Sequence, residues 1–165
     1  MTEDKTEYII DESTVNSYLS KDEKESLKFE VLILFLTKNK KRATILNSLA
    51  DMIDKISNLG LRNKIKDITI RQSYFKEEDN DERKNLIILS KNCSTFSNDI
   101  IFITEKYLDK PFNIEIGKVT QVFSLNKFIS SLEKIPEFSS YIAEYYFIKK
   151  YKEVNDTFFS AFRVA

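Results

Sequence analysis

A continuous apolar run at residues 31–36, VLILFL, constrains the fold of this chain more than any other feature. It follows residues 27–30, LKFE, in which apolar and charged side chains alternate. A short apolar run with such a flank is typical of a strand that is buried on both faces of a sheet. The run is also far shorter than the roughly 20 residues that a membrane-spanning helix requires. We therefore expect residues 27–36 to form the central strand of a sheet, and we expect no membrane partner.

The segments that follow this run predict a crossover connection. Residues 40–59 carry apolar side chains at spacings of three and four, which is typical of an amphipathic helix. Gly60 follows them as a suitable C-terminal cap. Residues 65–74 then alternate apolar and polar side chains, as a strand does. A strand, a helix and a second strand in this order favour a right-handed crossover between parallel strands.

The rest of the chain predicts shorter elements. Asp11 or Ser13 is suited to cap a helix that begins near Val15. Further strands are expected at residues 86–89, 100–104 and 114–122, and further helices at 125–134 and 138–155. The strands at 86–89 and 100–104 form either an antiparallel hairpin or two separate members of the sheet.

Together these elements predict an α+β fold with a single globular domain over residues 1–165. The expected architecture is a mixed sheet of about five strands, with a strand-helix-strand crossover, antiparallel strands and C-terminal helices packed on the sheet. A three-layer α/β sandwich is the alternative, and the long stretch without a clear helix between residues 75 and 123 disfavours it. Residues 1–10 are expected to form a flexible acidic N-terminus.

The composition excludes several classes of enzyme. The chain has no His, one Cys and two Gly. Zinc sites built from His and Cys, His-dependent catalytic triads and glycine-rich phosphate loops therefore cannot form within it. A single Cys and an acidic N-terminus without a secretory signal favour a reducing compartment, so we expect a cytoplasmic protein without a bound cofactor.

Carboxylate chemistry with Mg²⁺ is the catalytic route that remains, because Mg²⁺ needs only oxygen ligands. Glu82 and Lys84 form a Glu-x-Lys pattern, with Asp67 upstream. They adjoin the very polar segment 76–84, which we interpret as a solvated loop. Cys93 lacks a His that could activate it, so we interpret it as a structural thiol. We therefore predict a non-enzymatic protein with no catalytic or metal-binding residues.

A basic turn is the first candidate binding feature. Residues 26–74 carry 10 basic and 4 acidic side chains, a net charge of +6. The turn contributes four of these cations, Lys38, Lys40, Lys41 and Arg42. On the predicted elements it joins the end of a strand to the N-terminus of a helix, where a bound anion such as nucleic acid would relieve the repulsion between cations and helix dipole. The alternative is a solvated basic surface. Arg62, Lys64, Lys66 and Arg71 extend the patch only if the fold places them on the same side.

An excess of aromatic residues near the C-terminus is the second candidate. One apolar stripe of the predicted helix can face the core, and more aromatic side chains are present than that stripe can hold. The candidate partner-binding residues are Tyr141, Tyr145, Tyr146, Phe147, Tyr151, Phe158, Phe159 and Phe162. Exposed aromatic side chains favour protein interfaces. The leading hypothesis is an assembly protein that binds another protein or itself through this helix; the alternatives are a helix buried in a groove and polyanion binding by the basic turn.

Overall fold

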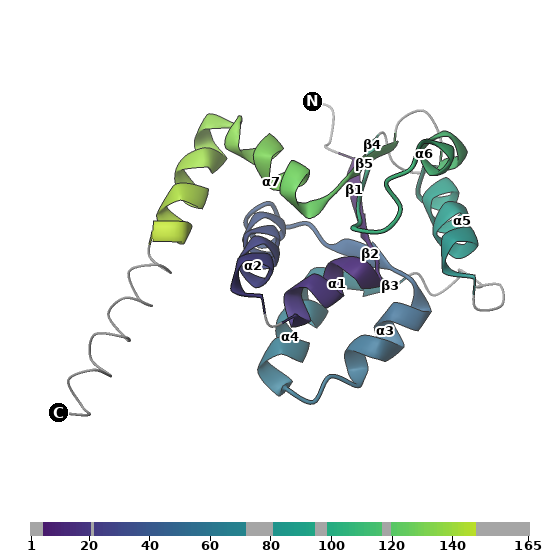
Figure 1. Ribbon diagram of the computed structural model, residues 1–165, viewed down its shortest axis with the longest axis horizontal. Coiled ribbons are helices and arrows are strands. Elements are labelled where there is room, and N and C mark those ends of the chain that lie inside the picture. Colours follow the sequence, from purple (N-terminus) through teal and green to yellow (C-terminus); the bar gives the residue numbers. More distant parts are fainter. Residues whose placement is uncertain (1–4, 21, 72–80, 95–98, 117–119, 148–165) are drawn as a thin grey trace. The chain divides into compact units, whose positions relative to one another are not determined.

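The computed structural model describes residues 5–20, 22–71, 81–94, 99–116 and 120–147, and Figure 1 shows their arrangement. The chain forms two compact units, residues 1–128 and 129–165. No helix in the described ranges has the length and apolar character needed to cross a membrane.

The first unit is built on a five-stranded sheet in which every pair of neighbouring strands is parallel. The strands are β1 (Thr6–Ile10), β2 (Ala43–Ile45), β3 (Thr69–Arg71), β4 (Asp99–Ile103) and β5 (Thr120–Phe123). Their order across the sheet is β3-β2-β1-β4-β5. The predicted mixture of helices and strands and the number of strands are confirmed. The predicted antiparallel strands and mixed sheet are wrong, because all of the pairings are parallel.

Helices connect the parallel strands and cover both faces of the sheet (Figure 1). These helices are α1 (Glu12–Leu19), α2 (Glu23–Lys38), α3 (Asn47–Asp54), α4 (Leu59–Ile68), α5 (Glu82–Ser94) and α6 (Lys110–Ile116). A further helix, α7 (Leu125–Glu133), follows β5. All three apolar residues of β1, Tyr8, Ile9 and Ile10, are buried. Burial on both faces is what a parallel sheet requires, since its crossover helices lie on the faces. The sheet and the helices on its two faces form three layers, as in the α/β sandwich that was the alternative prediction.

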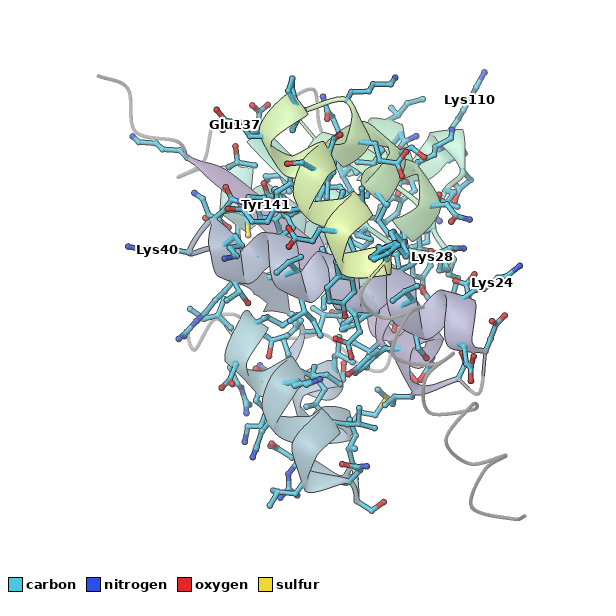
Figure 2. All side chains as sticks on the ribbon, turned by 90° about the vertical axis from the view of Figure 1, so that its left-hand side faces the viewer. Lys24, Lys28, Lys40, Lys110, Glu137 and Tyr141 are labelled. Carbon is cyan, nitrogen blue, oxygen red and sulfur yellow. The ribbon has the colours of Figure 1, made fainter. Side chains whose placement is uncertain are left out.

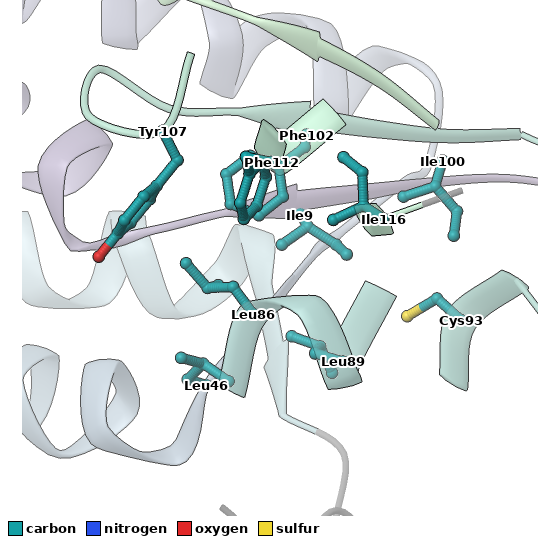
Figure 3. Packing of buried hydrophobic residues seen from close by; sticks show 10 residues of the cluster. All are labelled: Ile9, Leu46, Leu86, Leu89, Cys93, Ile100, Phe102, Tyr107, Phe112 and Ile116. Atoms are coloured by element: carbon teal, nitrogen blue, oxygen red, sulfur yellow. The ribbon is translucent and has the colours of Figure 1, made fainter. Parts of the chain in front are cut away.

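One face of the sheet packs against α5 and α6. Ile9 of β1 and Phe102 of β4 belong to a buried cluster that also contains Leu86 and Leu89 of α5 and Phe112 of α6 (Figure 3). The Phe102 and Phe112 rings meet edge to face, with centroids 5.3 Å apart. Burial of these large side chains holds the two helices on the sheet.

The opposite face carries an aromatic cluster from three elements. Tyr8 of β1, Phe35 of α2 and Phe128 of α7 pack edge to face, with ring centroids 5.6 Å apart for Tyr8 and Phe35 and 5.4 Å apart for Phe35 and Phe128. Side chains alternate between the two faces of a strand, so Tyr8 reaches this cluster while Ile9 reaches the other.

The predicted central strand at residues 27–36 is wrong, because these residues lie in α2. Asp22 caps this helix, and its side chain accepts a hydrogen bond from the Lys24 N–H. The fully buried residues of α2 include Phe29, Leu32 and Leu36, at helical spacings of three and four. Val31 is also fully buried, and the remaining apolar residues are partly buried, so residues 31–36 present apolar side chains around the circumference of the helix. A helix with apolar residues on most of its circumference cannot be distinguished from a buried strand by periodicity.

The predicted helix at residues 40–59 is also wrong in extent. The structure divides this segment into β2 and α3, and α4 begins at Leu59. Gly60 therefore lies in the first turn of α4, which Asn58 caps by accepting a hydrogen bond from the Leu61 N–H. Within the predicted strand at 65–74, residues 65–68 form the end of α4, and residues 69–71 form β3. The predicted crossover does exist, but it runs from β2 through α3 and α4 to β3.

The other predicted elements have mixed outcomes. Residues 86–89 lie in the helix α5. Of the strands predicted over 114–122, residues 114–116 lie in α6 and residues 120–122 lie in β5. Residues 6–10 form β1, so this part of the predicted flexible N-terminus is ordered in the sheet. The Asp11 cap, the strand near 100–104 and the helix near 125–134 are confirmed as the cap of α1, β4 and α7. The last predicted helix is present over residues 136–147, and its remainder lies outside the described residues.

Candidate functional site at the carboxyl edge of the sheet

The strand order places a topological switch point between β1 and β4. From β1 the chain continues to β2 and β3 on one side, and it returns to add β4 and β5 on the other side. The connections leave the carboxyl ends of β1 and β4 toward opposite faces. In open parallel sheets, ligands bind in the crevice outside the carboxyl ends at such a point. The residues that follow β1 and β4 are therefore the candidate site.

Asp11 follows β1 directly and caps α1. It is 2% exposed. Its Oδ1 accepts hydrogen bonds from the Thr14 N–H at 3.2 Å, from Thr14 Oγ1 at 3.0 Å and from Ser13 Oγ at 2.7 Å. A buried carboxylate is costly unless such donors surround it. Local donors from the first turn of α1 therefore hold Asp11 Oδ1 in one position.

Thr104 follows β4 directly and joins the ends of the two strands. Its Oγ1 donates to Asp11 Oδ2 at 2.6 Å and accepts hydrogen bonds from the backbone N–H groups of Lys106 and Tyr107. The Glu105 N–H donates to Ser13 Oγ at 2.9 Å. These bonds connect the loop after β4 to the first turn of α1, so the edge of the switch point is held rigidly.

Glu82, in the first turn of α5, adds a second carboxylate to this edge. The Tyr107 hydroxyl donates to Glu82 Oε1 at 2.7 Å, and Glu82 Oε2 takes no part in that bond. Burial raises the pKa of Glu82, the negative charges of Asp11 and Glu12 add to the rise, and the Tyr107 hydrogen bond opposes it. Burial is thus the main cause of the raised pKa of Glu82, and the neighbouring carboxylates contribute less.

Two more carboxylates, those of Glu12 and Glu105, follow the same strand ends. Both residues are exposed. Glu105 Oε1 accepts a hydrogen bond from the Leu125 N–H at 2.8 Å and so holds the start of α7. Among the described residues, no three His, Cys, Asp or Glu side chains are grouped closely enough to hold a metal ion by themselves. A cation at this edge would need water or a ligand oxygen in addition to one or two carboxylates.

The predicted basic turn joins the end of a helix to a strand, whereas the sequence predicted a turn from a strand to a helix. Lys38 is the last residue of α2, and the turn leads into β2, so it adjoins the C-terminus of a helix. Cations are favourable at that end of the helix dipole, and the predicted electrostatic conflict does not arise. The Lys41 ammonium donates to the Thr6 carbonyl oxygen at 3.4 Å, and Lys40 extends outward (Figure 2). Anion binding by Lys38, Lys40, Lys41 and Arg42 remains a prediction, without the helix N-terminus that motivated it.

The described part of the C-terminal helix carries half of the predicted partner-binding residues. Tyr141 is 46% exposed and Phe147 is 71% exposed. Tyr145 and Tyr146 are partly buried, and their rings meet edge to face. Burial raises the pKa of Tyr146, and Glu133 adds to the rise. The other four residues, Tyr151, Phe158, Phe159 and Phe162, lie outside the described residues.

The structure places the residues of the Glu-x-Lys pattern and the upstream Asp67 on different helices. Asp67 is exposed on α4, whereas Glu82 and Lys84 lie in the first turn of α5. Residues 82–84 are therefore helical and do not belong to a loop. Cys93 is buried in the cluster between the sheet and α5, as expected for a structural thiol.

Comparisons with protein-family models, with curated proteins and with solved structures find no match for this chain. The assignment of a function therefore rests on the geometry alone.

Proposed function

We propose that the first unit binds a divalent cation, with Mg²⁺ as the physiological candidate, together with a phosphate group at the carboxyl ends of β1 and β4. The reaction class that fits this arrangement is metal-assisted hydrolysis of a phosphoester. One observation supports the proposal above the others: two carboxylates meet the loop that follows β4. The Thr104 hydroxyl donates to Asp11 Oδ2 at 2.6 Å, and the Tyr107 hydroxyl donates to Glu82 Oε1 at 2.7 Å. Carboxylates grouped at a switch point are suited to hold a cation.

The chemistry of Mg²⁺ suits a site with few carboxylates. Mg²⁺ keeps several waters and is held by one or two protein carboxylates plus the phosphate oxygens of the substrate. Asp11 and Glu82 would supply those carboxylates. The cation would polarise the phosphoryl oxygen and lower the pKa of a bound water, and neither step requires the His that this chain lacks.

The test compares Glu82→Gln with Asp67→Asn. Asp67 is an exposed carboxylate on α4, so its replacement removes one negative charge away from the switch point. We expect Mn²⁺ to broaden the amide NMR signals of residues 11–14 and 104–107 in the unaltered protein and in Asp67→Asn, and to broaden them much less in Glu82→Gln. Hydrolysis of bis(p-nitrophenyl) phosphate should follow the same pattern. The proposal fails if Mn²⁺ does not act on these residues, or if both variants respond alike.

The competing proposal is the non-catalytic protein interaction through the C-terminal helix. The exposed rings of Tyr141 and Phe147 support it, because large exposed apolar side chains mark protein interfaces. Phe147→Ser is expected to shift a self-associating protein toward monomer in sedimentation experiments. Ala143→Ser is the matched control, since Ala143 is exposed on the same helix and the change introduces the same hydroxyl. A monomer at high concentration that retains no protein from a native extract would exclude this proposal. Both proposals are compatible with the predicted cytoplasmic location.

A further inference from the structure

A pocket of about 170 Å³ lies beside β2 and β3, apart from the switch-point residues. It extends from Arg71, at the carboxyl end of β3, to Thr69 and Lys66 at the amino end of this strand. Ile45, at the end of β2, lines it together with Ala50 and Ile53 of α3. These three residues are buried, so they give the pocket an apolar floor. Asp54, Lys66 and Arg71 supply charged groups around that floor.

We propose that this pocket binds a small organic anion, in which an apolar group sits on the floor formed by Ile45, Ala50 and Ile53 while a phosphate or carboxylate contacts Lys66 and Arg71. The inference does not depend on the proposed function at the switch point. Its residues lie on other strands and helices, and none of them is a candidate ligand for the divalent cation.

The charges around the pocket are predominantly positive. Lys66 Nζ lies 2.9 Å from Asp54 Oδ1, and Arg62 Nη1 donates to the Asp54 carbonyl oxygen at 3.4 Å. Lys66, through its hydrogen bond and its charge, lowers the pKa of Asp54, and Arg71 and Arg62 lower it further. Three cations therefore act on one carboxylate, and an incoming anion meets a net positive potential.

Arg71 is positioned to present its guanidinium at this pocket. It is the last residue of β3, and its Nε donates to Asn47 Oδ1 at 3.0 Å. That bond orients the planar group and uses only one of its nitrogens. The two terminal nitrogens carry further donors, in a geometry that matches the paired oxygens of a carboxylate or a phosphate.

The volume limits the size of the ligand. A cavity of about 150 Å³ is sufficient for a benzene molecule, whereas drug-sized ligands occupy about 300 Å³ or more. A pocket of about 170 Å³ therefore accommodates one ring or a short aliphatic chain, with the anionic group at the rim.

The fold also separates the basic residues that the sequence grouped as a possible patch. Arg62, Lys66 and Arg71 all lower the pKa of Asp54, which lines the pocket. Lys64 instead lies 3.4 Å from Glu30 Oε1 of α2 and does not line the pocket. This difference provides a control, because Lys64 and Lys66 are two exposed lysines on one helix.

The experiment uses phenyl phosphate as the probe and two-dimensional amide NMR of the full chain as the readout. We expect saturable shifts at residues 45, 50, 53 and 71, with affinity about tenfold weaker for phenol, which lacks the anion, and for inorganic phosphate, which lacks the ring. Lys66→Gln and Arg71→Gln should each weaken binding about fivefold, while Lys64→Gln leaves it unchanged. Asp54→Asn should tighten binding, because it removes the competing carboxylate. Circular dichroism of each variant confirms that the fold is retained.

Several results would overturn the inference. Absence of saturable shifts at the pocket residues would exclude the site. Equal affinities for phenol and phenyl phosphate would reduce it to an apolar cavity. Equal weakening by Lys64→Gln and Lys66→Gln would mean that the anion responds only to overall charge.

Discussion

Replacement of Asp11 by Ala should destabilise the first unit more than the loss of an ordinary helix cap does. The Asp11 carboxylate caps α1 through the Thr14 N–H and also accepts the hydrogen bond from the Thr104 hydroxyl, 93 residues away in the chain. Loss of a cap costs about 1 kcal/mol. Loss of a buried hydrogen bond to a charged group costs about 2 kcal/mol more. We therefore expect Asp11→Ala to lower the free energy of unfolding by about 3 kcal/mol.

Asp22→Ala is the matched control for this change. Asp22 caps α2 by accepting a hydrogen bond from the Lys24 N–H at 3.0 Å, but it is exposed and has no equivalent of the Thr104 bond among its described contacts. Its replacement should cost about 1 kcal/mol. The chain has no Trp, so urea unfolding is best followed by far-ultraviolet circular dichroism. The difference between the two variants measures the link between β1 and β4.

A double-mutant cycle with Thr104→Val isolates the hydrogen bond itself. Because Asp11 Oδ2 and Thr104 Oγ1 lie 2.6 Å apart, the two substitutions should not be additive, and their coupling energy should exceed about 1 kcal/mol. The reasoning is refuted if Asp11→Ala costs no more than Asp22→Ala, or if the two changes add within about 0.5 kcal/mol.

Three further outcomes follow from the same contacts. Glu82→Gln should raise the free energy of unfolding at neutral pH, because the pKa of Glu82 is raised in the folded protein. This stabilisation should vanish below pH 4.5, the ordinary pKa of Glu, where Glu82 is protonated in both the folded and the unfolded state. Urea unfolding at several pH values measures the change. Arg83, 3.0 Å from Asp109, lowers the pKa of Asp109 from 3.8 to about 2, so the protein should lose stability relative to Asp109→Asn as the pH falls through this interval in acid titrations. Phe112→Ala should cost about 3 to 5 kcal/mol in urea unfolding, because Phe112 is fully buried against Phe102 and leaves a cavity.

Local signals in the sequence predicted the features that depend on local contacts. The sequence predicts Asp11 or Ser13 as the cap of the first helix, and the structure has Asp11, whose partner, the Thr14 N–H, is three residues away. The strand near 100–104 and the helix near 125–134 were also recognised from their own patterns. By contrast, residues 31–36 gain their helical form from burial between other elements, and their apolar pattern fits a strand equally well.

Short strands in the parallel sheet were the main source of error. β2 and β3 contain three residues each, too few for an alternating pattern to stand out. The segment around β2 also has helical periodicity because α3 follows after a single residue, Leu46. The antiparallel pairing was an inference from short apolar runs, one of which, residues 86–89, belongs to α5.

The candidate site depends on long-range order that no local pattern contains. A polar residue follows each apolar strand end, Asp11 after β1 and Thr104 after β4, and this signal was present in the sequence. Its meaning required the knowledge that β1 and β4 are parallel neighbours, because only then do both carboxyl ends lie at one edge. Glu82 joins them because α5 begins near that edge. The sequence did not predict this helix start, because residues 76–84 are very polar and are typical of a loop.

The two proposed sites lie on different strands and carry opposite charges, and this difference makes them separable. The pocket at β2 and β3 attracts an anion without assistance, since cations surround it. The switch point at β1 and β4 repels an anion until a cation neutralises its carboxylates. Mg²⁺ should therefore leave the affinity of the pocket for phenyl phosphate unchanged, and Arg71→Gln should leave the Mn²⁺ broadening near Glu82 unchanged. If Mg²⁺ instead strengthens binding of phenyl phosphate and Arg71→Gln abolishes the gain, the two regions form one extended site that a single ligand contacts.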